Sequence, residues 1–311
     1  MLIKRGSLRL GTALLVLLAV FTITFVMMRL APGSPFSRMK GVSRGASQNM
    51  AVHFGHDRPM LEQYFGVLWR NLRGDLGPSV AFSPGEPVTR ILARGFPVSL
   101  KLGLVALIIA LLLGVPLGLI TGLAPGRRLD RLVSGVSLGI MSASVIVLGA
   151  LLRKWFIADL GWFSLGGFNS FSSGFLPCLT LGVAYAVIFL RLVRGNVRGL
   201  VGARAVGAVG ARGVPRAVIL ARYVAPGALI PMLAYMGPAV AGILTGSFVV
   251  ETLFEVPGVS ACFIQGAAAR DYPLVSGAIL SYTAILLVAN FFFETLHSLL
   301  DPRQRLKRGD A

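Results

Sequence analysis

The amino-acid sequence predicts an all-α integral membrane protein with six transmembrane helices. Of its 311 residues, 55% are hydrophobic and only 14% are charged, and the mean hydropathy is +0.78. Soluble domains carry about 25% charged residues, so a soluble fold is excluded. Six apolar segments each have close to the roughly 20 residues that cross a bilayer. The net charge of +18 is spread over the loops between them, where it sets topology and forms no nucleic-acid-binding face.

The first predicted span follows three basic residues and runs from Leu10 to Met28. This run is longer than the apolar core of a signal peptide, about 7 to 15 residues, and no convincing cleavage site follows it, so we expect an uncleaved span. Gly114 and Gly118 in the second span form a small-xxx-small pair, which permits close helix contact. The five further predicted spans are Val98 to Ala124, Leu132 to Ile157, Phe175 to Leu192, Ala228 to Val250, and Leu274 to Leu299.

The distribution of charge predicts that both termini are cytoplasmic. The N-terminus, the Gly126 to Arg131 turn, the Arg191 to Arg222 loop and the tail after Asp301 together hold 17 lysines and arginines. The same regions hold only three acids, Asp130, Asp301 and Asp310. The opposite side carries eight of the twelve acids, which offset most of its basic residues. Lysine and arginine concentrate on the cytoplasmic side of a membrane protein.

Four regions follow from this topology. Residues 1–30 form an N-terminal transmembrane helix, 31–97 an external segment, 98–300 the transmembrane core with a cytoplasmic loop at 193–227, and 301–311 a cytoplasmic tail. The external segment contains a predicted amphipathic helix, Met60 to Leu72, with apolar residues at helical spacing. Such a helix typically packs on the bundle or lies at the bilayer interface, and a role in substrate binding is the alternative.

Sequence motifs for catalysis or metal binding are absent. The chain lacks the phosphate loop that cradles ATP, and it lacks the usual serine-hydrolase and zinc-protease motifs. Cys178 and Cys262 are too few for a disulfide framework or a zinc site, and the three histidines do not cluster with other ligands. We therefore expect no catalytic residue and no metal. Any energised work must draw on a partner or on an ion gradient.

Three carboxylates, Glu251, Glu255 and Asp271, flank the last predicted outer loop. Paired carboxylates can perform acid/base chemistry, but no nucleophile, metal cluster or orienting histidine accompanies these. A structural or gating role is favoured. Glu294 falls within the last apolar segment, where a carboxylate is expensive, but it lies near the cytoplasmic end and within reach of water.

A series of short motifs runs along the chain. They are Arg29 to Pro35 (RLAPGSP), Asp57 to Pro59 (DRP), Asn71 to Gly77 (NLRGDLG), Gly114 to Gly118 (GVPLG), Val249 to Phe254 (VVETLF), Val256 to Gly258 (VPG), Ala269 to Pro273 (ARDYP) and Leu299 to Arg303 (LLDPR). Each is weak alone, but their order and spacing are specific. In these motifs the sequence resembles the permease subunits of ATP-binding cassette (ABC) importers, in the dipeptide/oligopeptide/nickel branch. The resemblance implies a type I ABC importer permease architecture in a bacterial cytoplasmic (inner) membrane.

The resemblance also implies that the basic loop from Arg191 to Pro231 docks onto an ATPase. The family pattern is a short helix of the form Glu-Ala-Ala-x-x-x-Gly followed by a closing Ile-Pro or Leu-Pro. Here the glycine falls on Gly213 and the closing pair on Ile230-Pro231, whereas Gly207 replaces the acid. The implied coupling helix comprises Gly207, Ala208, Val209, Gly210, Ala211, Arg212, Gly213 and Val214.

The composition of this coupling segment departs from the family pattern. Five glycines between Gly199 and Gly213 each weaken an isolated helix by about 1 kcal/mol relative to alanine, so we expect it to form firmly only against its partner. Without acids, the contact would be mainly apolar and shape-based, or coupling would be altered. Ser142-Ala143-Ser144 stands where the family commonly has a proline, which argues against a kink in the third span.

The resemblance implies several partners. These are a second homologous permease subunit, two cytoplasmic ATPase subunits that bind ATP and Mg, and an external solute-binding protein, besides the lipid bilayer. This chain itself would bind no cofactor and no nucleic acid. Glu251, Glu255 and Asp271 would lie at an outer gate or at the contact with the binding protein.

Substrate and energy source leave alternatives. Peptides are the expected substrate of this branch, and nickel chelates or another small solute are the alternative. A gradient-driven carrier or channel acting alone is a second class, but such proteins place ionisable groups near the bilayer midplane and these spans are nearly free of them. A purely structural anchor would not need six spans and a long basic loop.

Overall fold

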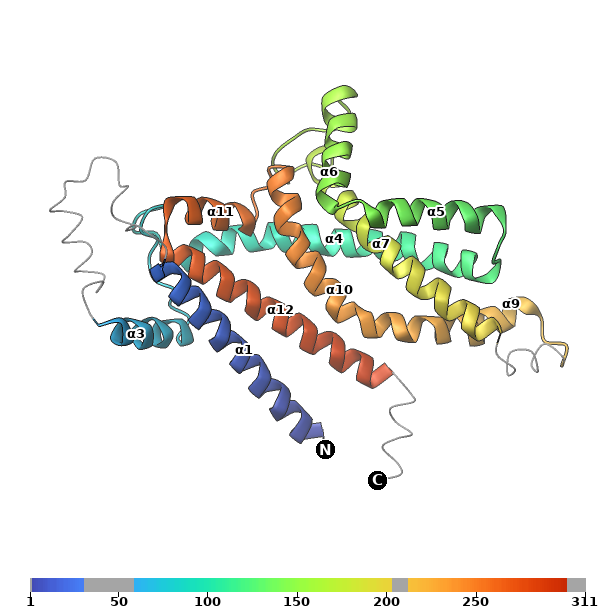
Figure 1. Cartoon of the computed structure of the whole chain (residues 1–311), viewed down its shortest axis with the longest axis horizontal. Helices are drawn as coiled ribbons and strands as arrows, with labels where there is room; N and C mark the ends of the chain where they lie inside the picture. The colour runs from blue at the N-terminus through green and yellow to red at the C-terminus, as the bar shows by residue number, and fades with distance from the viewer. Residues whose placement is uncertain (1, 31–58, 203–211, 301–311) are drawn as a thin grey trace. The chain divides into compact units, whose positions relative to one another are not determined.

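The computed structural model describes residues 2–30, 59–202 and 212–300, and its elements are helices (Figure 1). The described α-helices are α1 (Leu2–Leu30), α3 (Met60–Leu72), α4 (Val88–Leu123), α5 (Arg128–Ser142), α6 (Val145–Arg153), α7 (Phe171–Val201), α9 (Arg216–Ile219), α10 (Ala225–Leu253), α11 (Val259–Ala269) and α12 (Tyr272–Leu300). Two short π-helices, η2 (Lys154–Asp159) and η3 (Leu220–Val224), continue α6 and α9. The chain divides into a first unit, residues 1–99 with 257–287, and a second unit, residues 100–256 with 288–311.

The predicted membrane spans correspond to helices. Five helices among the described residues are long and apolar enough to cross a membrane, and a bent pair makes a sixth if it counts as one span. The predicted amphipathic helix from Met60 to Leu72 coincides with α3. Helix α4 begins at Val88, ten residues before the predicted span, so the expected boundary between the external segment and the core falls inside this helix.

The third predicted span is bent, and the expectation of an unkinked helix there was wrong. Helices α5 and α6 meet at an angle of 101°. Ala143 is extended (φ −81°, ψ 134°), and the hydroxyl of Ser144 caps α6 by accepting a hydrogen bond from the Ile146 N–H at 3.3 Å. Serine favours helix N-caps because its side chain replaces a missing backbone acceptor. Capping by Ser144 therefore ends one helix and starts the next without a proline.

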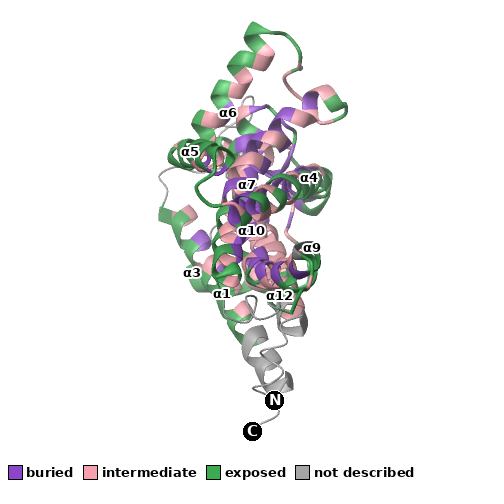
Figure 2. Ribbon diagram, turned by 90° about the vertical axis from the view of Figure 1, so that its right-hand side faces the viewer, coloured by how far each residue is buried: buried purple, intermediate pink, exposed green. Residues whose placement is uncertain are grey.

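Helix α7 lies at the centre of the second unit. Of its most apolar window, 61% is buried, compared with 28% for α4, and Figure 2 colours much of its ribbon as buried. Helix α4 approaches it through glycines: a Cβ added at Gly114 would lie 2.6 Å from the Ala186 carbonyl oxygen, and one at Gly118 2.8 Å from that of Leu190. Small residues let backbones approach in membranes. The predicted small-residue pair is thus an intrachain contact between α4 and α7.

The first unit contains α1, α3, α11, and the starts of α4 and α12. The loop from Asp75 to Pro87 closes on itself, because Pro78 and Pro87 form an isolated β-bridge and the Ser79 N–H donates to the Glu86 carbonyl at 2.8 Å. A Cβ at Gly277 in α12 would meet Val88 at 2.7 Å and Leu76 at 3.1 Å. This close approach seats the loop against the beginning of α12.

Candidate functional site

The predicted coupling segment is described only at its C-terminal end. Gly207 to Ala211 lie outside the described residues. Arg212 and Gly213 are exposed and Val214 is half-buried, just before α9. Gly213 has a φ of +80° with nothing within 4 Å of an added Cβ. This left-handed conformation costs an L-residue roughly 1–2 kcal/mol, so backbone geometry alone explains the glycine that matches the family pattern.

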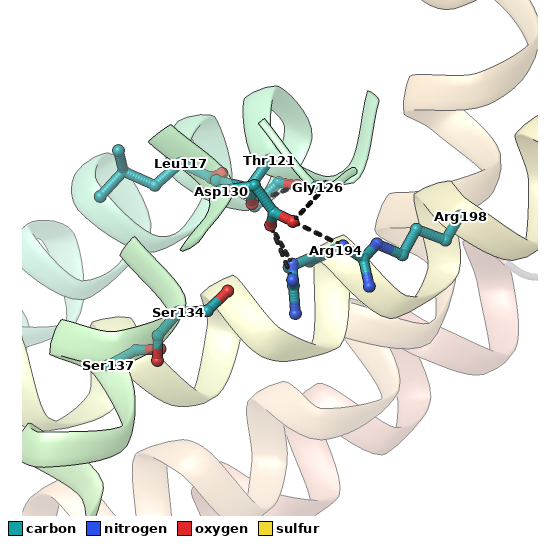
Figure 3. Close-up of polar contacts among 9 residues, drawn as sticks. Leu117, Thr121, Gly126, Asp130, Ser134, Ser137, Arg194 and Arg198 are labelled. Carbon is teal, nitrogen blue, oxygen red and sulfur yellow. Dashed lines mark hydrogen bonds and ion pairs between the residues drawn. The ribbon is translucent and has the colours of Figure 1, made fainter. Parts of the chain in front are cut away.

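The end of α7, which leads into this segment, is fixed by one buried carboxylate (Figure 3). Asp130, in the first turn of α5, is 4% exposed. It accepts hydrogen bonds from the Gly126 N–H at 2.8 Å, from Arg194 Nε at 2.8 Å and from Arg198 Nη2 at 2.9 Å. Charge-assisted bonds of this kind are stronger than neutral ones. We call these four residues the Asp130 clamp.

The clamp connects the α4–α5 turn to the C-terminal end of α7. Arg194 and Arg198 lie four residues apart, so both project from the same face of α7. In the sequence, Asp130 stood out only as one of three acids in the arginine-rich regions that are predicted to be cytoplasmic. A lone acid among many arginines was the available signal, but its partners lie 64 and 68 residues away.

The other end of the loop is also held to α7. The amide of Asn196 donates to the Ala228 carbonyl in α10 at 3.3 Å. A Cβ at Gly227 would lie 2.9 Å from Leu200, so α10 begins in close contact with the last turn of α7. The loop that contains the coupling segment therefore leaves from the end of α7 and is held to α7 again at the start of α10.

In the second unit, the end of α10 is tied to α6 on the predicted outer side. Arg153 donates to the Leu253 carbonyl at 2.7 Å, and its Nη2 lies 3.6 Å from Glu255 Oε1. The N–H groups of Gly166 and Gly167 donate to the carbonyls of Phe254 and Glu255 at 3.2 and 3.3 Å. The following turn is thereby held from two sides.

Glu251 and Glu255 belong to this turn but differ in exposure. Glu251 is 1% exposed, and its carbonyl accepts from the Val256 N–H at 2.8 Å. The Glu255 side chain is 61% exposed and its backbone adopts a left-handed φ of 55°. An exposed ion pair such as Glu255 with Arg153 contributes at most about 1 kcal/mol, so this pair holds the Glu255 side chain only weakly.

Asp271 lies in the first unit and is fully buried, with 0% exposure. Its Oδ2 accepts hydrogen bonds from the Ser79 hydroxyl and from the N–H groups of Val80, Ala81 and Phe82, the last three at 2.9, 2.9 and 3.0 Å. Its Oδ1 accepts from the Leu274 N–H at 3.2 Å and so caps α12. This carboxylate pins the loop from Asp75 to Pro87 to α12 and does not reach the surface.

The described residues contain no candidate metal-binding cluster. Among residues 2–30, 59–202 and 212–300, no group of three or more histidine, cysteine, aspartate or glutamate side chains could hold a metal ion. Glu294 is exposed on α12. Cys178 is buried and Cys262 half-buried, and both carry reduced thiols.

Known proteins match nearly the whole chain. Residues 114–306 match the family model described as "Binding-protein-dependent transport system inner membrane component". The chain is 33% identical over 296 residues to the dipeptide transport system permease protein DppB of Bacillus subtilis, covering 94% of this chain and 95% of that protein. It is 35% identical over 292 residues to the oligopeptide transport system permease protein OppB of Salmonella typhimurium, covering 93% and 95%.

The fold is also found among solved structures. An inward-facing conformation of the MetNI methionine ABC transporter matches with a TM-score of 0.59 at 16% sequence identity, covering 68% of this chain and 97% of that chain. At this identity the likeness concerns the fold alone. The predicted all-α membrane fold class is confirmed.

Proposed function

The chain belongs to the family of binding-protein-dependent transport system inner membrane components, and from this premise we propose that it is a permease subunit of an ABC importer of di- or oligopeptides. The proposed substrate class rests on how much of two peptide permeases this chain matches. A dipeptide permease and an oligopeptide permease each match over 95% of their own length. The chain is thus an inner-membrane, non-catalytic transport subunit, and what it transports is the proposal.

Family membership implies an ATPase and a binding protein as partners. We infer a finer arrangement in which this chain pairs with a second homologous permease, and two ATPases bind ATP and Mg below the pair. The translocation path would form between the permeases. In this arrangement the helices of this chain would move as rigid bodies and open the path alternately to either side of the membrane.

The coupling segment Gly207–Val214 is the proposed contact with the ATPase. Support comes from the two ends of its loop, because the loop leaves directly from α7 and the start of α10 is bonded back to α7 through Asn196 with Ala228. The Asp130 clamp joins α7 in turn to the α4–α5 turn. A displacement of the segment would therefore be passed to α7 and, through Asp130, to the α4–α5 turn. Since α7 is the most buried of the spanning helices, its movement must shift its neighbours.

The outer carboxylates are proposed to serve the external side in two ways. Glu255 is exposed and is the proposed contact with the binding protein. Glu251 and Asp271 are buried, and we propose that they hold the outer-gate turns in shape, each within its own unit.

An uptake assay tests the function. The full importer, with both permeases, the ATPases and the binding protein, is reconstituted in liposomes and supplied with labelled di- and tripeptides or with a nickel chelate. We expect peptide accumulation that requires both ATP and the binding protein. If the liposomes accumulate the nickel chelate and no peptide, the substrate is a nickel chelate and the proposed peptide substrate is wrong. Ion-gradient-driven uptake by this chain without an ATPase would make it a carrier and overturn the proposal.

The binding-protein contact has its own test. Glu255→Gln is compared with Glu62→Gln, an exposed acid on α3. Because charges at the edge of an interface mainly act on association rates, we expect only Glu255→Gln to raise the binding-protein concentration needed for half-maximal uptake and to weaken its salt dependence. Equal effects of the two substitutions would remove Glu255 from the interface.

A further inference from the structure

Helix α3 carries an exposed apolar strip. Its members recur at intervals of three or four residues and so share one side of the helix. They are Leu61, Phe65, Trp69 and Leu72, with exposed fractions of 71%, 62%, 58% and 67%. Glu62, Gly66 and Arg70 occupy a neighbouring face and are also exposed. A contiguous apolar surface beside a polar one indicates a contact with an apolar partner.

A different side of α3 is fixed to α1. The ring of Tyr64 lies 5.2 Å from that of Phe21 and 5.4 Å from that of Phe25, between centroids. Its hydroxyl forms a 2.8 Å hydrogen bond with the Thr22 hydroxyl. Phe21 and Phe25 are buried, with exposed fractions of 2% and 8%. Helix α3 is therefore attached to a membrane-spanning helix within the same unit.

The attachment point lies below the outer end of α1. The apolar stretch of α1 ends at Leu30, which faces outward because the basic N-terminus is cytoplasmic. At a rise of 1.5 Å per residue, Phe25 is about 7 Å and Thr22 about 12 Å below that end. Half of the hydrocarbon core is about 15 Å thick. Tyr64 therefore meets α1 at the depth of the outer leaflet.

Two neighbouring features match a position at the lipid boundary. The guanidinium of Arg73 lies 4.8 Å above the Trp69 ring, which keeps a cation beside an aromatic ring of the kind enriched at headgroup level. On α1, Ile23 and Met27 are 59% and 66% exposed, and only 17% of the span is buried. The strip on α3 is thus attached to a helix that faces lipid.

We propose that α3 is an interfacial helix that inserts Leu61, Phe65, Trp69 and Leu72 into the outer leaflet of the bilayer. The partner of this surface is lipid. Helix α3 leads through Gly74 and Gly77 into the loop that Asp271 pins to α12. Its insertion sets the height of that external loop above the membrane.

Spin labelling tests this proposal. The full chain, purified with its associated subunits, carries Cys178→Ala and Cys262→Ala and receives one nitroxide label at Phe65→Cys or at Gly66→Cys. Gly66 is a matched control, because it is adjacent, faces the polar side, and has nothing within 4 Å of an added Cβ. The protein is placed in phosphatidylcholine/phosphatidylglycerol liposomes. Collisions are measured with oxygen, which concentrates in lipid, and with a water-soluble nickel complex.

The outcomes separate lipid, water and protein. We expect the label at position 65 to collide several-fold more often with oxygen than with nickel, and the label at 66 to show the reverse. High nickel accessibility at both positions would place the helix in water and overturn the proposal. An immobile label at position 65, shielded from both reagents, would mean that protein covers the strip and would also overturn it. Leu61→Cys repeats the measurement at a second strip position.

Discussion

Arg194 and Asp130 join two elements 64 residues apart in sequence: Arg194 Nε lies 2.8 Å and Nη2 2.7 Å from the same oxygen, Asp130 Oδ1. Arg198 reaches the other oxygen of that carboxylate at 2.9 Å. Two arginines of α7 are thus neutralised in part by one acid of α5. The contact lies between the predicted coupling loop and the α4–α5 turn, so it is positioned to carry force between them.

Replacing Asp130 by asparagine should uncouple transport from ATP hydrolysis. The amide would keep the shape of the carboxylate but lose its charge, and one of the two acceptors would become a donor facing an arginine. We expect peptide uptake per ATP hydrolysed to fall several-fold, with ATPase subunits still bound. Asp159→Asn, an exposed aspartate outside the clamp, is the control. Unchanged coupling in Asp130→Asn, with Asp130→Glu equally unaffected, would make the clamp irrelevant to force transfer.

Gly213→Ala should weaken docking of the ATPase. Alanine in the left-handed region costs roughly 1–2 kcal/mol, which corresponds to a factor of about 5–30 in an equilibrium constant. Gly195→Ala is matched, because its added Cβ also meets nothing within 4 Å but its φ is ordinary. The measurement is recovery of ATPase on the purified permease in detergent. If both variants retain the ATPase equally, the conformation at Gly213 is not needed for docking.

Asp271→Ala should destabilise the first unit. The substitution leaves the N–H groups of Val80, Ala81 and Phe82 without their acceptor. The contact to Val80 is buried and the other two are part-buried, and an unsatisfied donor that is fully buried costs about 1–3 kcal/mol. We expect a fall in Tm of several degrees and faster proteolysis between residues 75 and 87. Asp75 is exposed, and its side chain accepts one hydrogen bond, from the Gly77 N–H. Asp75→Ala should therefore change Tm far less. Similar Tm values for the two variants would contradict the anchoring role.

Gly118→Ala should force α4 and α7 apart. The added methyl would lie 2.8 Å from both the Leu190 carbonyl oxygen and Val193 Cβ, and overpacking of this kind costs about 1–3 kcal/mol. Gly135→Ala is the control, since nothing lies within 4 Å of a Cβ at that helix position. Thermal unfolding in detergent checks the difference. A Tm for Gly118→Ala that equals that of the wild type would mean that the helices repack without cost.

The sequence by itself determined the spans, the topology and the family. Hydropathy reports the local free energy of placing a segment in lipid, and the arginine asymmetry reports which loops stay in the cytoplasm. These are local quantities, so the helix at Met60–Leu72 could be placed without tertiary information. The motifs marked the coupling segment, but Gly207–Ala211 lie outside the described residues and that assignment remains a prediction.

Only the tertiary structure decided which polar groups meet. Asp271 receives donors from residues about 190 positions away, and Asp130 receives two arginines from another helix. No periodicity encodes such pairs, because they depend on how helices pack after insertion. The bend at Ala143 shows the same limit, because the missing proline argued against a kink and a serine cap accompanies the bend instead. The buried carboxylates therefore acquire their roles as anchors from the packing around them.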